Sequence, residues 1–129
     1  MADSLQQFSG PVYSIARIVF AFLYLSHGLN WLFGTFGGMQ AEFPSQFWFA
    51  GVIELVFGSL LLVGLFTRFA AFIASGEMAV AYFIGHVPRG SYFPIENGGE
   101  ITVAFCFMFF FMIFHGGGPF SVDRLMKKK

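Results

Sequence analysis

The sequence predicts an all-α membrane protein, in which four transmembrane helices form one antiparallel bundle with both termini in the cytoplasm. The first observation is composition, since 57% of the 129 residues are hydrophobic and only 11% are charged. Typical soluble domains carry about 25% charged residues, and so short a chain cannot bury this much apolar surface in a soluble core. The other two observations are four long apolar segments and an uneven distribution of lysine and arginine between their connections.

The first predicted span covers residues 11–33. Pro11 follows a serine and a glycine, which is typical of a helix start, and the segment reaches the roughly 20 residues that a bilayer requires. Tyr24, His27 and Trp31 recur at spacings of three and four residues. They therefore share one polar and aromatic face of a helix that is otherwise suited to lipid.

The second predicted span covers residues 46–66, and its only charged residue is Glu54. Gly51 and Gly58 lie three residues before and four residues after this glutamate, so all three share one face. Small residues on a transmembrane helix allow a neighbouring helix to approach closely. We therefore expect a close helix contact around a carboxyl group that is held in the membrane neutral or paired.

The third predicted span covers residues 68–87, and the short turn before it makes an antiparallel hairpin with the second span. Thr67 is a candidate cap for this helix. Glu77 and His86 are nine residues apart, about 900° or half a turn out of phase in a straight helix. Unless the helix distorts near Gly85, Glu77 faces away from His86, and we expect it to form a buried ion pair with Arg17 of the first span.

The fourth predicted span covers residues 97–116. Asn97 and Glu100 have the spacing of a capping box, so Glu100 is expected to cap its own helix unless it joins a functional site. The chain as a whole, residues 1–129, is expected to be a single membrane domain.

Orientation follows from the positive charges. The connection between the second and third spans and the C-terminal tail lie on the same side of the membrane and carry Arg68, Arg124 and the run 127–129. The connections on the other side carry a single basic residue, Arg89. Cytoplasmic segments are enriched in lysine and arginine, so both termini are predicted to face the cytoplasm.

Four ionisable residues, one from each span, are predicted to lie near the outer ends of the helices within a layer on the order of 10 Å thick. Ionisable side chains are costly in hydrocarbon and commonly mark functional sites there. His27 and Glu54 are the candidate catalytic residues, although a structural hydrogen bond between them would explain His27 equally well. The candidate cofactor-binding residues are His27, Glu54, His86, Glu100, Trp48 and Tyr82.

A bound metal is not expected, because no helix offers two ligands at the spacing of a metal-binding motif. The net charge of zero gives no indication of a nucleic-acid partner. A single cysteine, Cys106, excludes an internal disulfide and a CxxC redox pair.

Several of these segments together resemble the DoxX family of small four-helix membrane proteins. The similar segments are Arg17-x9-His27-Gly28, Gly51-x2-Glu54-x3-Gly58, Gly64-Leu65-Phe66-Thr67-Arg68, Ala81-x4-His86, Gly98-Gly99-Glu100 and Asp123-Arg124-Leu125. The resemblance implies a bacterial or archaeal inner membrane and a loose association with redox enzymes, including those that use quinones. Glu77 is not part of this pattern.

The leading functional hypothesis is a redox-associated membrane protein that binds quinone between its helices or serves an oxidoreductase as a membrane subunit. His27 and Glu54 would then hydrogen-bond the quinone oxygens and move protons, and a partner redox subunit would supply electrons because the chain has no cofactor motif of its own. One alternative is a non-catalytic structural or assembly subunit of a larger complex. A second is a small proton or ion translocating module, which would require a homo-oligomer. The residues leave open whether the protein is an enzyme.

Overall fold

The structure is a computed structural model that describes residues 2–127, and these residues are helical with no strand among them. The all-helical prediction is confirmed. Lys128 and Lys129, which contributed to the predicted orientation, lie outside the described residues. The longer helices are α2 (Ser9–Phe33), α3 (Gln46–Val63), α4 (Thr67–Ala81) and α6 (Glu100–His115); the shorter elements are α1 (Ala2–Gln6), η1 (Thr35–Gly37), η2 (Tyr82–His86), η3 (Val87–Arg89), α5 (Pro94–Asn97) and α7 (Val122–Lys127).

Within residues 2–127, three stretches are long and apolar enough to cross a membrane: α2, α3 and the continuous helical segment Thr67–Arg89. The fourth apolar helix, α6, has 16 residues and begins at Glu100, because the expected span 97–116 is interrupted by two glycines after α5. A bilayer crossing takes about 20 residues. The fourth crossing therefore stays a prediction.

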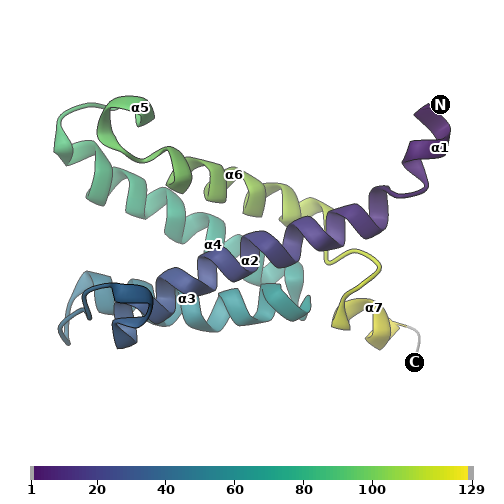
Figure 1. Ribbon diagram of the computed structural model, residues 1–129, viewed down its shortest axis with the longest axis horizontal. Coiled ribbons are helices and arrows are strands. Elements are labelled where there is room, and N and C mark those ends of the chain that lie inside the picture. The colour runs from purple at the N-terminus through teal and green to yellow at the C-terminus, as the bar shows by residue number, and fades with distance from the viewer. Residues whose placement is uncertain (1, 128–129) are drawn as a thin grey trace.

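The helices are arranged as two pairs, with α2 packed along α3 and α4 packed along α6 (Figure 1). Contacts between α3 and α4 join the pairs, whereas α2 and α6 touch over a short stretch. Both ends of the chain lie at the same end of the bundle (Figure 1). The buried core between the pairs combines small and aromatic residues: Ala21, Tyr24, Leu61, Ala70, Ala71, Ala74, Met78, Phe105, Phe109 and Met112.

Glycines on α3 set its close approach to α2, as their spacing predicts. A Cβ atom added at Gly58 would lie 3.1 Å from the Cα of Leu25, and one at Gly51 would lie 2.9 Å from the Cβ of Trp31. Helix α3 begins at a serine cap, where the Oγ of Ser45 accepts a hydrogen bond from the N–H of Trp48 at 3.1 Å. This tight pairing holds Glu54, which lies between the two glycines on α3, against α2.

The expected ion pair between Arg17 and Glu77 is wrong. The guanidinium of Arg17 is buried near the end of the bundle that holds the termini and donates to backbone carbonyls. Its Nε donates to Leu61 at 2.9 Å, and its two terminal nitrogens donate to Leu62, Gly117 and Phe120. Carbonyls near helix ends lack intrahelical donors, so a planar cation with five N–H groups suits them. Arg17 thereby ties α2 to the end of α3 and to the C-terminal segment.

The start of α4 is capped by the tail rather than by Thr67, which corrects a second expectation. One carboxylate oxygen of Asp123 accepts from the N–H of Phe66 at 2.8 Å, and the other accepts from the N–H of Thr67 at 2.9 Å. Partial burial raises the pKa of the Asp123 carboxyl, but these N–H donors and the nearby charge of Arg17 outweigh it, so the pKa lies below its ordinary value. The N-terminus of α4 therefore depends on a residue about 56 positions later in the chain.

The far end of the third predicted span is distorted. Tyr82–His86 form a π-helical turn, which then tightens into the 3-10 turn Val87–Arg89. One extra residue in a helical turn changes the phase by about 100°. Such a change would bring Glu77 and His86, half a turn apart in a straight helix, to within about 80° of each other, and both residues line one cavity. The sequence left open whether the helix distorts near Gly85, and the structure shows that it does.

The predicted capping box at the start of α6 is wrong. Asn97 is the last residue of α5 and is 3% exposed. Its side chain accepts from the N–H of Gly99 at 2.9 Å and donates to the Tyr82 hydroxyl at 3.0 Å and to the carbonyl of Ser91 at 2.9 Å. The cap position of α6 is occupied by Gly99. Asn97 thus fastens the loop onto the π-helical turn and leaves Glu100 exposed.

Candidate functional site

A cavity of about 670 Å³ lies between the two helix pairs, at the end of the bundle away from the termini. Its walls come from all four longer helices and are mostly apolar and aromatic. The aromatic lining residues are Tyr24, Trp31, Phe47, Phe49 and Phe105; the other lining residues with polar or charged side chains are His27, Gln46, Glu54, Glu77, His86, Arg89 and Thr102. An apolar pocket with a few polar groups is the usual form of a small-molecule site.

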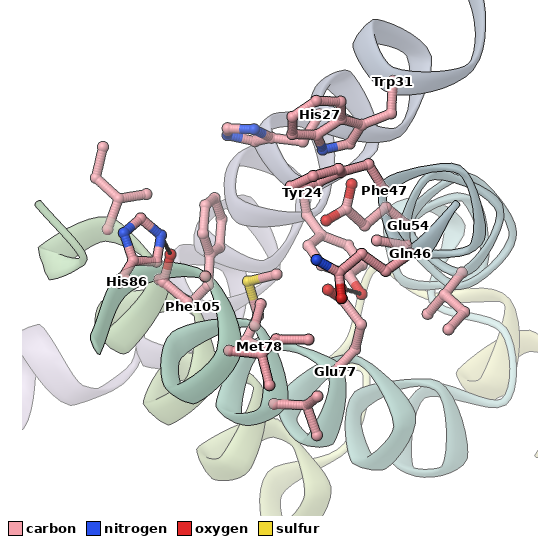
Figure 2. A pocket seen from close by; sticks show the side chains of 18 of the residues that line it. Tyr24, His27, Trp31, Gln46, Phe47, Glu54, Glu77, Met78, His86 and Phe105 are labelled. Carbon is pink, nitrogen blue, oxygen red and sulfur yellow. Dashed lines mark hydrogen bonds between the residues drawn. The ribbon is translucent and has the colours of Figure 1, made fainter. Parts of the chain in front are cut away.

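Two carboxyl groups meet in this cavity, one from each helix pair. Glu54 on α3 and Glu77 on α4 both line it, close enough for their carboxyl groups to interact electrostatically. The hydroxyl of Tyr24 on α2 donates to Oε1 of Glu77 at 2.8 Å. Figure 2 shows these three side chains together, with Glu54 near Tyr24 and Glu77 below them. The expectation that Glu77 lies outside the outer cluster is therefore wrong.

Two carboxylates are both acceptors, so Glu54 and Glu77 can share a hydrogen bond only when one of them carries a proton. Glu54 is 4% exposed, and its Oε2 is buried without a hydrogen-bond donor among the described residues. Within residues 2–127, no lysine, arginine or histidine forms an ion pair with either glutamate. The site therefore combines two neighbouring carboxyl groups from different helices with an acceptor oxygen that the described residues leave unsatisfied.

His27 and His86 line the same cavity from different sides. The imidazole of His27 lies edge-on to the ring of Phe105, with 6.0 Å between the ring centroids, and in Figure 2 it points away from Glu54. Within residues 2–127, no hydrogen bond joins His27 to Glu54. The expected structural hydrogen bond between these two residues is therefore absent. His86 lies near the carbonyl of Asn97 and 3.2 Å from the hydroxyl of Thr102.

Three other predicted binding residues do not line the cavity. Glu100 is exposed at the start of α6. Trp48 packs edge-on against the rings of Phe43 and Phe49. The hydroxyl of Tyr82 is occupied by the loop, where it donates to the carbonyl of Tyr92 and accepts from Asn97. Their part in binding a ligand stays a prediction.

Sequence reasoning missed most of the cavity lining, including Tyr24, Trp31, Glu77 and Phe105. The spacing of Tyr24, His27 and Trp31 correctly predicts that they share one helix face, which is the face that lines the cavity. The spacing does not predict that a cavity exists between the helices. Within residues 2–127, no group of three or more histidine, cysteine, aspartate or glutamate side chains could hold a metal ion.

The polar line that a translocating module would need is also rearranged. Such a line would run from the expected Arg17–Glu77 pair on the cytoplasmic side to His27 and Glu54 near the outer surface. In the structure the guanidinium of Arg17 is fully engaged by carbonyls near the termini, whereas Glu77 belongs to the cavity. The glutamates and histidines of the cavity therefore lie at one end of the bundle and Arg17 lies towards the other.

Comparison with known proteins identifies relatives over the whole chain. The family model described as DoxX matches residues 12–87. A protein of Haemophilus influenzae is 39% identical over 133 residues, which cover 98% of this chain and 99% of the relative. A second protein of the same organism is 30% identical over 135 residues, covering 93% of this chain and 86% of the relative. Both are described only as uncharacterized proteins. No solved structure matches the chain.

Proposed function

Because the chain belongs to the DoxX family, we propose that it is a redox-associated integral membrane protein that binds a lipid-soluble quinone in the outer cavity. The observation that carries the proposal is the pair of carboxyl groups of Glu54 and Glu77, placed with Tyr24 in an aromatic cavity of about 670 Å³. A flat, apolar ring with hydrogen-bonding oxygens fits such a lining. The resemblance to DoxX, which implies a link to redox enzymes, supports the same choice.

The proton chemistry of a quinone matches these groups. Reduction of a quinone to a quinol takes up two electrons and two protons, and oxidation returns them. The carboxyl pair and the hydroxyl of Tyr24 form a connected set that can give a proton to a quinone oxygen or receive one from it. The electrons come from a partner redox subunit. His27 and His86 line the same cavity and offer further donors for the ring oxygens.

Access from the lipid supports a membrane-soluble ligand. Exposed apolar residues of α3 and of the α4 segment line the cavity, among them Phe49, Val80 and Ile84. These side chains face outward in the membrane region, so a hydrophobic ligand reaches the carboxyl pair without crossing water. A charged soluble substrate would have to desolvate first.

The proposal includes the arrangement in the membrane. Four crossings, with α6 as the fourth, put both termini in the cytoplasm of a bacterial inner membrane and the cavity near the outer surface. The distribution of lysine and arginine supports this orientation. The packing of α6 along α4 supports its insertion, since α6 supplies Phe105 and Thr102 to the cavity.

The two tryptophans provide a direct test. Trp31 lines the cavity and Trp48 does not, so Trp48→Phe leaves one tryptophan inside the site and Trp31→Phe leaves one outside it. In lipid nanodiscs, decylubiquinone is expected to quench Trp31 fluorescence saturably, while quenching of Trp48 rises in proportion to the quinone dissolved in the lipid.

Glu54→Ala in the single-tryptophan protein is expected to weaken saturable quenching about tenfold, since a hydrogen bond to a charged or proton-sharing group is worth roughly 1.5 kcal/mol. Glu96→Gln, an exposed change outside the cavity, is the matched control and leaves the affinity unchanged. Equal quenching of both tryptophans, or an unchanged affinity in Glu54→Ala, would rule out quinone binding at this site.

A further inference from the structure

The cavity has an uncompensated acidic centre. Glu54 on α3 and Glu77 on α4 lie close together in the cavity. Among the described side chains, only the hydroxyl of Tyr24 on α2 donates a hydrogen bond to this pair, at Glu77. The other charged or titratable side chains of the lining come from α2 and the α4 segment. His27 packs against Phe105, His86 faces Asn97 and Thr102, and Arg89 is exposed.

One oxygen of this centre lacks a donor. Oε2 of Glu54 is buried and accepts no hydrogen bond within residues 2–127, and the residue as a whole is only 4% exposed. A buried acceptor without a donor is unfavourable, and a buried carboxylate without a cation is more so. A ligand that brings both an N–H donor and a positive charge removes both costs at once.

The walls around the acidic centre suit the rest of such a ligand. Trp31, Phe47 and Phe105 line the cavity close to the two glutamates, and Trp31 stacks on Phe47 with 4.8 Å between their ring centroids. Aromatic faces attract ammonium groups and pack against apolar bodies. The volume of about 670 Å³ lies within the range of sites for drug-sized molecules, roughly 300 to 1,000 Å³.

We propose that the cavity binds a lipophilic protonated amine, with the ammonium group between Glu54 and Glu77 and the apolar body against Trp31, Phe47 and Phe105. Binding exchanges one cation for another. The ammonium keeps its own protons, the carboxyl pair releases one proton to water, and the net charge of the cavity is unchanged. This inference uses the same cavity as quinone binding but does not depend on it.

The test compares an amine with its neutral form in the unmodified protein. Dansylcadaverine is a fluorescent primary amine with an aromatic body, and its N-acetyl derivative keeps the body but has no charge. In phosphatidylcholine nanodiscs, after subtraction of the signal of empty discs, the amine is expected to bind at least tenfold more tightly than the acetylated compound. Proton exchange predicts that its affinity rises about tenfold per pH unit between pH 6 and 8.

Variants assign the effect to the carboxyl pair. Glu54→Gln with Glu77→Gln keeps hydrogen-bonding side chains of the same size and is expected to remove the preference for the amine, while Glu96→Gln retains it. Equal binding of the charged and acetylated compounds, an affinity independent of pH, or a preference that survives in the double variant would each overturn the proposal. The assay contains no quinone, so its failure would leave the quenching experiment unaffected, and the reverse also holds.

Discussion

Asp123 offers a sharp test of how the tail stabilises the bundle. Its carboxylate accepts hydrogen bonds from the N–H groups of Phe66 and Thr67, at 2.8 and 2.9 Å, where α4 begins. Asp123→Ala removes both acceptors, and Asp123→Asn keeps one acceptor oxygen but removes the charge. Both changes leave the cavity untouched, because Asp123 lies at the opposite end of the bundle.

The expected loss follows from the two contributions of a capping carboxylate. Loss of a cap costs about 1 kcal/mol of the free energy of unfolding, and loss of a negative charge at an exposed helix N-terminus costs roughly 0.3 to 1 kcal/mol. Asp123→Ala is therefore expected to lower the free energy of unfolding by about 1–2 kcal/mol, and Asp123→Asn by about half as much.

The pH dependence has a definite sign. The pKa of Asp123 in the folded protein is below its unfolded value of about 3.9, so the carboxylate stabilises the folded state at every pH above that value. This contribution is lost as the pH falls through the folded pKa. The difference between the wild-type protein and Asp123→Asn should be constant at neutral pH and should shrink below about pH 4.

Reversible unfolding in mixed micelles, followed by circular dichroism as the fraction of sodium dodecyl sulfate is raised, measures these differences. Glu42→Gln, an exposed loop substitution, is the control for a lost negative charge. A free energy of unfolding that is unchanged in Asp123→Ala would refute the assignment of Asp123 as the cap of α4. A difference from Asp123→Asn that persists undiminished at pH 3 would refute the electrostatic part of it.

Two further predictions concern packing and topology. Gly58→Val should lower the free energy of unfolding by about 1–3 kcal/mol, because the new side chain meets the backbone of α2. Gly76→Ala is the control: its Cβ meets nothing within 4 Å, so this change should be neutral or stabilising. An equal effect of the two changes would contradict the close contact of α2 and α3. In a cysteine-free background, a membrane-impermeant maleimide added outside spheroplasts should label Glu96→Cys but label Asp3→Cys only after permeabilisation, and outside labelling of both would exclude a cytoplasmic N-terminus.

Glu77 shows where sequence reasoning about the site reached its limit. Periodicity in a straight helix put it half a turn from His86, and Arg17 then appeared to be its partner. The π-helical turn Tyr82–His86 changes that phase, and Arg17 finds its partners among backbone carbonyls that no sequence pattern displays. The partners of Arg17 lie 44 to 103 residues later in the chain, beyond the reach of a local pattern.

The tail gives a second example. The Asp123-Arg124-Leu125 segment was recognisable as part of a family pattern, but its physical role was not. Asp123 caps a helix that begins at Thr67, and the N–H of Asp123 donates to the carbonyl of Gly64 at 2.9 Å. Local capping rules pointed to Thr67 and Asn97 instead, because such rules consider only residues that are neighbours in sequence.

Composition, apolar periodicity and glycine spacing determined by themselves that this chain is helical, that its helices suit a membrane, and that Glu54 sits on a closely packed face. These properties depend on local preferences and on the solvent that each side chain requires, and both can be read along the chain. Only the tertiary structure decided which titratable groups share a cavity. That outcome depends on how the helices pack side by side, which brings together residues far apart in the chain.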